Sequence, residues 1–246
     1  MKRFLFLFIL LLPVTHAYTC AVYFTGVGCP HCAKTDPFIF SQVLKKHPDL
    51  VIIEYEIYQQ QENSVFLMQY ADRYGTGLGI PLIIFSNKSI IGDIPILENL
   101  EKTLEELNGS PCPLLDGQVP FEEVEDLPGS PKIWAGDRVL IRTGEKPLGN
   151  YKELLFSDLS QLTATEIDPQ PVPISGSWIT FDHAVQLDGW VLEWRGNQAN
   201  KQTAESCDQG IQAQSYLILG LVIAFLFILL SYLLRKKKIK NQKMKK

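Results

Sequence analysis

Two cysteines separated by two residues are the side chains in this sequence best suited to covalent chemistry. Cys29 and Cys32 enclose Pro30 and His31, and two thiols at this spacing on a helix's first turn can form and break a small disulfide ring with little backbone movement. We expect Cys29 to be exposed, with the positive end of the helix dipole and free N–H groups favouring its thiolate. That thiolate would attack a partner's disulfide, and Cys32 would then resolve the mixed disulfide.

The residues alone leave two other uses of this pair open. A C-x-x-C can be half of a zinc site, for which His16 or His47 would be the further ligands, or it can form a merely structural disulfide. The sequence has no second C-x-x-C. We therefore predict no metal site and no cofactor.

The other three cysteines are Cys20, Cys112 and Cys207. An odd number means that at least one is free, paired between chains or oxidised by a partner. Cys20 with Cys112 is one candidate disulfide within the chain, and Cys207 is a candidate link between two chains.

Hydrophobic patterning predicts the elements that position the motif. A buried strand ends in Gly26-Val27-Gly28, directly before Cys29, and the helix that follows contains Pro37, which should kink it or mark a second start. The predicted elements are a strand at 21–25, a helix at 33–46, a strand at 51–58, a helix at 62–74, strands at 80–85 and 89–91, and a helix at 94–107.

This order of elements, with Cys29-Pro30-His31-Cys32 at the start of the first helix, resembles the thioredoxin-like superfamily. The resemblance implies an α/β fold class, a minimal thioredoxin-like fold, for residues 18–112. Pro81 falls where this family keeps a cis-proline facing the cysteines, after a β-branched residue, here Ile80. Ile80 and Pro81 are therefore expected to bind the backbone of an extended substrate. The alternative is an ordinary trans proline that opens a strand.

The two residues between the cysteines carry a further resemblance. The Pro30-His31 pair is similar to that of DsbA-type oxidases, whose reduced thiolate form is unusually stable. A stabilised thiolate makes the disulfide form a stronger oxidant, so the resemblance implies that the chain donates disulfides, with Pro30 and His31 tuning the redox balance.

Two carboxylates on the second predicted strand, Glu54 and Glu56, are candidates for proton relay to Cys32 if either points inward. A strand carboxylate is more often solvated, so neither is included in the predicted site.

The second half of the chain has a different pattern of apolar and turn-forming residues. Short apolar runs at 139–141, 178–181 and 190–194 lie between turns rich in Pro and Gly, which predicts a small, mainly β domain at 117–200 with no catalytic motif. Residues 201–215 are polar and are predicted to form a juxtamembrane stalk.

Both ends of the chain carry targeting patterns. Residues 1–17 have a basic start, an apolar run and small residues at a cleavage site, as in a signal peptide; an uncleaved anchor or a lipoprotein at Cys20 are the alternatives. Residues 216–234 contain no charge and precede a basic tail at 235–246. They predict one transmembrane helix with a cytoplasmic tail, and hence a single-pass cell-membrane protein, unless this segment is a buried helix of a soluble core.

Charge is divided unevenly along the chain. The two ends hold ten of the 23 basic residues, which leaves 13 against 27 acidic residues between them, a net charge near −14. An acidic segment argues against a nucleic-acid partner.

These features together predict an enzyme, a membrane-anchored thiol–disulfide oxidoreductase that oxidises or isomerises disulfides. Its expected partners are cysteine-containing secreted or membrane proteins, together with a candidate membrane redox partner. The alternatives are a non-catalytic peptide-binding or adaptor module, and a reductase supplied with electrons by another membrane protein.

Overall fold

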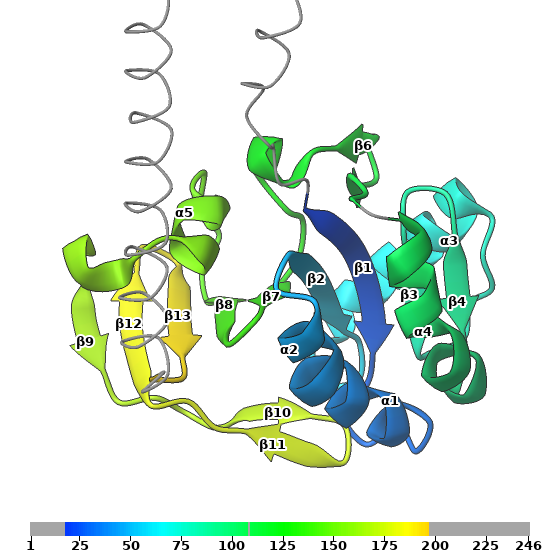
Figure 1. The fold of residues 1–246 in the computed structure, drawn as a ribbon, viewed down its shortest axis with the longest axis horizontal. Coiled ribbons are helices and arrows are strands. Elements are labelled where there is room, and N and C mark those ends of the chain that lie inside the picture. The colour runs from blue at the N-terminus through cyan, green and yellow to red at the C-terminus, as the bar shows by residue number, and fades with distance from the viewer. Residues whose placement is uncertain (1–17, 108, 197–246) are drawn as a thin grey trace, which may run out of the picture. The chain divides into compact units, whose positions relative to one another are not determined.

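In the computed structural model, which describes residues 18–107 and 109–196, nine strands join into one mixed sheet (Figure 1). Their order across the sheet is β4-β3-β1-β2-β7-β8-β13-β12-β9. In chain order, the strands are β1 (Thr19–Thr25), β2 (Leu50–Glu56), β3 (Leu82–Ile84), β4 (Ser89–Ile91), β7 (Lys132–Ala135), β8 (Arg138–Arg142), β9 (Thr165–Ile167), β12 (His183–Leu187) and β13 (Trp190–Trp194).

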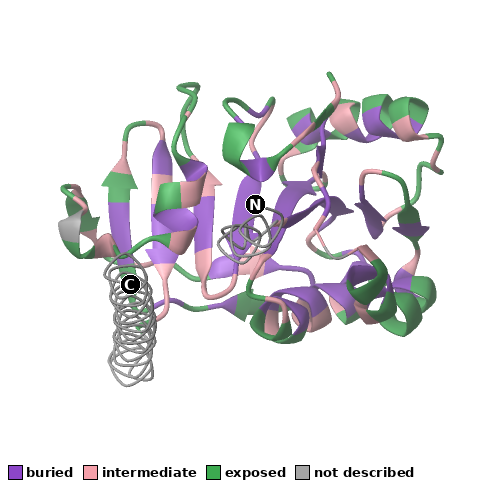
Figure 2. Ribbon diagram, turned by 45° about the horizontal axis from the view of Figure 1, so that its top comes forward, coloured by how far each residue is buried: buried purple, intermediate pink, exposed green. Residues whose placement is uncertain are grey.

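The parallel pair β1 and β2 lies inside the sheet. Thr19 of β1 is in register with Leu50 of β2, and the pairing continues to Thr25 and Glu56. The neighbouring pairs, from β1 with β3 and from β2 with β7 outward, are antiparallel. All seven residues of β1 and all seven of β2 are buried, which is why both strands are near-continuous apolar runs rather than alternating ones. Figure 2 shows the buried central strands between partly exposed helices.

Helices cover the sheet on both faces. The first face packs against α1, α2, α4 and a separate hairpin of β10 and β11, and the second against α3, α5 and the segment around Phe121. The helices are α1 (Cys32–Phe38), α2 (Leu44–Lys46), α3 (Ser64–Tyr74), α4 (Asp93–Leu107) and α5 (Tyr151–Phe156). The short elements are η2 (Ile39–Val43), η3 (Gln61–Asn63), η4 (Phe121–Glu123), η5 (Leu159–Gln161), β5 (Cys112–Pro113), β6 (Gln118–Val119), β10 (Val172–Ile174) and β11 (Ser177–Ile179).

The first helical segment is interrupted as its proline requires. Pro37 lies inside α1 and has no N–H to donate to the preceding turn. The chain then continues as a π-helical turn, η2, before α2 completes the segment. The predicted kink at Pro37 therefore takes the form of a change in helix type.

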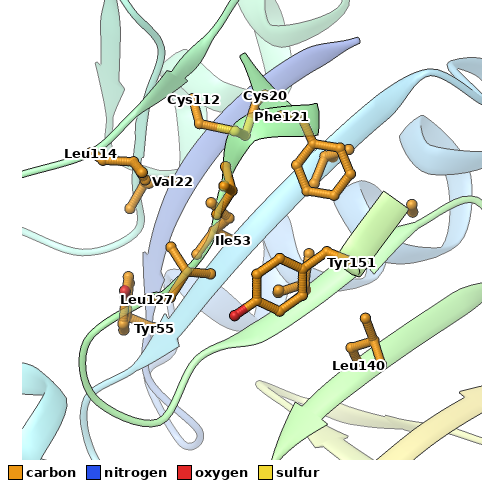
Figure 3. Packing of buried hydrophobic residues seen from close by; sticks show 14 of the residues in the cluster. Cys20, Val22, Ile53, Tyr55, Cys112, Leu114, Phe121, Leu127, Leu140 and Tyr151 are labelled. Carbon is orange, nitrogen blue, oxygen red and sulfur yellow. A yellow bond between two sulfur atoms is a disulfide. The ribbon is translucent and has the colours of Figure 1, made fainter. Parts of the chain in front are cut away.

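The second face holds the core that joins the two halves of the sequence. Val22 of β1 and Ile53 of β2 share this cluster with Leu140 of β8 and with Leu127 and Tyr151 from the second half (Figure 3). The core is therefore continuous across the position where two domains were predicted.

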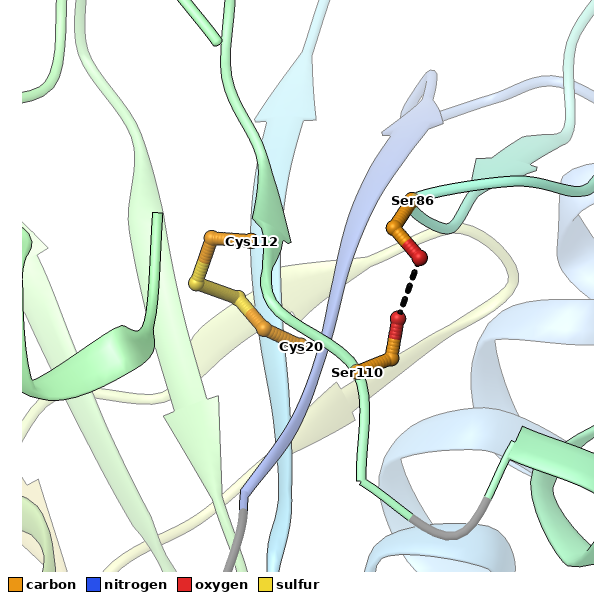
Figure 4. The surroundings of a disulfide bond; sticks show 4 residues. All are labelled: Cys20, Ser86, Ser110 and Cys112. Atoms are coloured by element: carbon orange, nitrogen blue, oxygen red, sulfur yellow. Dashed lines mark hydrogen bonds between the residues drawn. A yellow bond between two sulfur atoms is a disulfide. The ribbon is translucent and has the colours of Figure 1, made fainter. Parts of the chain in front are cut away.

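A disulfide between Cys20 and Cys112 links the first strand to the segment that follows α4 (Figure 4). The candidate pairing of these two cysteines is thus confirmed. Beside it, Ser86 and Ser110 share a hydrogen bond of 2.8 Å between their hydroxyl groups. Cys207, the candidate link between chains, lies outside the described residues.

The predicted fold class, a minimal thioredoxin-like fold followed by a separate small β domain and a transmembrane helix, is wrong. Val51–Glu54 of β2 pair with Lys132–Ala135 of β7, so strands from residues 117–200 extend the sheet that begins with β1. The physical reason is that β2 would otherwise present a row of unpaired N–H and C=O groups. The pairing with β7 satisfies these groups and produces a single nine-stranded sheet.

The prediction of a single-pass membrane protein is corrected as well. Across residues 18–107 and 109–196, no helix is both long and apolar enough to cross a membrane. The segment 216–234, on which that prediction depended, lies outside the described residues, as do the predicted signal peptide (1–17), stalk (201–215) and basic tail (235–246).

Candidate active site

The loop that carries the two cysteines connects the end of β1 to the start of α1. Gly28 has a φ of 95°, in the left-handed region that favours glycine, and the N–H of Cys29 donates to the carbonyl of Gly26 at 2.9 Å. α1 begins at Cys32. Cys29 therefore lies just before the helix, and Cys32 is its first residue.

Both cysteines are free thiols and both are buried. Cys29 is 3% exposed and Cys32 is 0% exposed, so the prediction of an exposed Cys29 is wrong. The prediction did not include the β10–β11 hairpin, which packs on this loop and covers it from one side.

The two sulfur atoms have different surroundings. The backbone N–H of Cys32 donates to Sγ of Cys29 at 3.3 Å, a contact that a thiolate at Cys29 would accept. Burial, with a smaller contribution from its contact with Cys29, raises the pKa of the Cys32 thiol, whereas the Thr25 side chain acts to lower it. The site thus keeps Cys32 as the protonated thiol and directs a backbone donor at Cys29, which suits Cys29 as the nucleophile.

His31 and Pro30 lie on the exposed side of the loop. Nδ1 of His31 is 3.0 Å from Oδ1 of Asp93, the first residue of α4, and Nζ of Lys34 is 2.6 Å from the other oxygen of this carboxylate. The hydrogen bond from Lys34, followed by that from His31, lowers the pKa of Asp93 to about 2. A charged carboxylate therefore orients the motif histidine at neutral pH.

A second carboxyl group, that of Asp36, lies beneath the motif and is fully buried. Tyr23 donates to it at 2.7 Å, Thr25 at 2.9 Å and the backbone N–H of Ser175 at 2.8 Å. Burial raises the pKa of Asp36 to about 7, although these hydrogen bonds act to lower it. In turn, the charge of Asp36 contributes to the raised pKa of Cys32.

The predicted substrate-binding residues lie at the start of the third strand segment. The Ile80–Pro81 peptide bond is cis, as predicted, and the carbonyl of Pro81 accepts from the N–H of Gly92 at 2.8 Å. A Cβ placed on Gly26 would lie 3.0 Å from Cδ1 of Ile80. The structure therefore brings Ile80 against the turn that positions Cys29.

Neither strand carboxylate is solvated, contrary to expectation. Glu54 accepts from Nζ of Lys132 at 2.7 Å and from the indole N–H of Trp134 at 2.5 Å. Glu56 accepts from four backbone N–H groups, those of Val27, Tyr58, Gln59 and Gln60. Glu54 thus belongs to the junction of β2 with β7, while Glu56 organises the loops at the end of β2.

Three residues of the site, Asp36, Asp93 and Ser175, were not predicted from the sequence. Asp36 had a usable signal, because it lies four residues after Cys32 and therefore on the same face of the helix. Asp93 and Ser175 had none, since only the tertiary fold brings them to the motif. Among residues 18–107 and 109–196, no group of three or more His, Cys, Asp or Glu side chains is placed to hold a metal ion.

Comparison with known proteins adds little to this geometry. No family model matches the chain, and no curated protein matches it. Among solved structures, the chain is similar to the crystal structure of a structural genomics target from Agrobacterium tumefaciens, with 16% sequence identity, coverage of 74% of this chain and 80% of that chain, and a TM-score of 0.32.

Proposed function

We propose that this chain is a thiol–disulfide oxidoreductase that uses Cys29 and Cys32 and that resembles the thioredoxin-like superfamily in its motif. The observation that carries the proposal is the asymmetric dithiol: an N–H directed at Sγ of Cys29 and a raised pKa at the buried Cys32. The place of the motif at the start of α1, where Cys32 is the first helical residue, supports it.

The exchange reaction balances within the two proteins. To reduce a partner, the Cys29 thiolate attacks one sulfur of the partner's disulfide and displaces the other as a thiolate. Cys32 then attacks Sγ of Cys29 while its proton passes to a thiolate of the partner, and the bond between Cys29 and the partner breaks. Cys29 and Cys32 become a disulfide, and the partner leaves with one thiol and one thiolate, which takes its proton from water. The reverse sequence transfers the disulfide to a reduced partner, and this is the direction that the Pro30-His31 pair favours.

The substrates that we propose are proteins with cysteine pairs. A native disulfide such as Cys20–Cys112 persists where the environment is oxidising, and such environments contain the proteins whose disulfides must be formed or rearranged.

Trapping of a mixed disulfide tests the proposal. The full chain with Cys32→Ala should form a stable adduct with oxidised glutathione at Cys29, detected by intact mass. The matched variant Cys29→Ala should form far less, because Cys32 is fully buried with a raised pKa. Both variants also carry Cys207→Ser, so that the fifth cysteine contributes no adduct. Equal adduct on the two variants, or none on either, would contradict the proposal.

The equilibrium reduction potential tests the direction of exchange. A value near the about −120 mV of DsbA supports a disulfide donor, whereas a value near the about −270 mV of thioredoxin supports a reductase.

A further inference from the structure

The β10–β11 hairpin places one residue of the second half directly on the cysteine motif. The hydroxyl of Ser175 donates to the carbonyl oxygen of Cys29 at 2.8 Å, and the N–H of Ser175 donates to Oδ2 of Asp36 at 2.8 Å. Ser175 and Asp36 are both 0% exposed. These contacts span 146 and 139 residues of sequence, and Figure 1 shows the hairpin lying beside α1.

The hairpin is anchored independently of these two hydrogen bonds. Val172, Ile174 and Ile179 are buried in the same apolar cluster as Phe40. At the turn, Gly176 has a φ of 77°, and a Cβ there would lie 2.8 Å from Cβ of Ala33. Because the apolar anchors and the glycine contact hold the turn against α1, loss of the Ser175 hydroxyl alone should leave the hairpin docked.

The two groups that Ser175 contacts, the Cys29 carbonyl and the Asp36 carboxylate, affect different cysteines. The Cys29 carbonyl already accepts from the N–H of Ala33 at 3.0 Å, so the Ser175 hydroxyl is a second donor, and its positive end lies beside the residue that carries the thiolate. A donor dipole of this sense stabilises nearby negative charge. The carboxylate of Asp36 has the opposite effect, because its charge disfavours a thiolate at Cys32.

We propose that Ser175 is a positioning residue of the dithiol centre, and that the β10–β11 hairpin sets the equilibrium between the dithiol and disulfide forms of Cys29 and Cys32 through it. The inference rests on the proposed function. In the equilibrium with glutathione, the two cysteine thiols give two protons and two electrons to one molecule of oxidised glutathione, which becomes two molecules of reduced glutathione.

Measurement of this equilibrium constant in the full chain with Cys207→Ser tests the inference. At pH 8, Ser175→Ala should shift the equilibrium about fivefold toward the protein disulfide, because the Cys29 carbonyl loses a hydrogen-bond donor of ordinary strength whose dipole favours the thiolate of the same residue. This shift corresponds to a reduction potential about 20 mV more negative, at about 30 mV per tenfold change.

Two further variants separate positioning from a general loosening of the site. Ser177→Ala changes an exposed serine of the same hairpin and should leave the equilibrium constant unchanged. Asp36→Asn removes the charge that disfavours a thiolate at Cys32. Because the raised pKa of Cys32 keeps it a protonated thiol at pH 8, this variant should leave the equilibrium constant close to that of the parent. A loosened fold would move both buried-site variants in the same direction and would lower their melting temperatures together.

The outcomes distinguish this inference from the proposed function. A shift toward the disulfide for Ser175→Ala, with Asp36→Asn and Ser177→Ala unchanged, supports it. If the unsubstituted pair equilibrates with glutathione but Ser175→Ala equals Ser177→Ala, or if both buried-site variants shift alike, the role of Ser175 is refuted and the oxidoreductase proposal stands. If the unsubstituted pair forms no disulfide with glutathione, both are refuted.

Discussion

Replacement of Asp36 by Asn measures how far the buried carboxyl group lowers the free energy of unfolding. The side chain is fully buried, and burial is the largest cause that raises its pKa from 3.8 to about 7. Below pH 3.8 the carboxyl group is protonated in both the folded and the unfolded chain. Between pH 3.8 and about 7 the folded chain keeps a proton that the unfolded chain has released.

The sign and size of the effect follow from this difference in bound protons. Because the folded chain binds more protons in this window, the free energy of unfolding falls by about 1.4 kcal/mol for each pH unit of increase. Over roughly three pH units, the loss reaches about 4 kcal/mol. The amide introduced by the substitution cannot titrate, so Asp36→Asn should gain up to this amount relative to the parent chain between pH 4 and pH 7.

Hydrogen bonding adds a second contribution to the difference in free energy of unfolding between the two chains, and this contribution does not change with pH. Tyr23, Thr25 and Ser175 all donate to the carboxylate, and an amide presents only one acceptor oxygen. We expect a constant penalty of about 1–3 kcal/mol for the donors left without an acceptor. The slope of the difference against pH, rather than its value at one pH, therefore reports the buried charge.

Urea unfolding at a series of pH values provides the measurement. Both chains carry Cys29→Ala and Cys32→Ala, which removes the reactive pair and prevents it from exchanging with the Cys20–Cys112 disulfide. Asp72→Asn, at an exposed position of α3, is the control and should give a flat difference. A flat difference for Asp36→Asn as well would refute the assignment of a raised pKa to this carboxyl group.

Three further changes should lower the free energy of unfolding, measured by urea titration. Cys20→Ala with Cys112→Ala opens a cross-link with a sequence separation of 92, which should cost up to about 4–5 kcal/mol by loop-closure entropy. Lys132→Met leaves its partner Glu54 as an unpaired charge that is 1% exposed, and should cost about 3–5 kcal/mol. Asn63→Ala removes a buried amide that joins the end of β2 to the loop before β7, and should cost about 2–3 kcal/mol.

An exposed ion pair provides the control for Lys132→Met. Lys46→Met breaks an ion pair with Glu101 in which both side chains are exposed, and should change the free energy of unfolding by less than about 1 kcal/mol. If Lys132→Met costs no more than Lys46→Met, the junction of β2 with β7 does not depend on its buried ion pair. A double cysteine variant as stable as the parent would show that the disulfide adds nothing to the fold.

The local elements around the motif could be predicted from the sequence. The apolar run of β1, the glycines before Cys29 and the amphipathic pattern of α4 each carry a signal within about fifteen residues, and the structure places those elements there. The cis bond at Pro81 came from a family resemblance, and it too depends on a short segment. The disulfide between Cys20 and Cys112 was one candidate among the leftover cysteines.

Pairings between distant segments carried no comparable signal. β7 reads Lys-Ile-Trp-Ala after a proline, a short run that does not reveal Lys132 as the partner of Glu54 across a strand pair. Without this pairing, Glu54 appeared to be an ordinary solvated strand residue, and the second half appeared to be a separate domain. The strands of the two halves form one nine-stranded sheet because β2 pairs with β7. Hydrophobic patterning does not predict this pairing.

The same limit applies to the candidate site, where the reactive atoms are local but the groups that tune them are not. Asp93 reaches His31 from α4, and Ser175 reaches Cys29 and Asp36 from the β10–β11 hairpin. A fragment that ended at Cys112 would keep both thiols, but it would lose Ser175 and leave the β2 edge unpaired. The redox equilibrium of such a fragment would therefore differ from that of the full chain, because the two halves form one sheet and share one buried site.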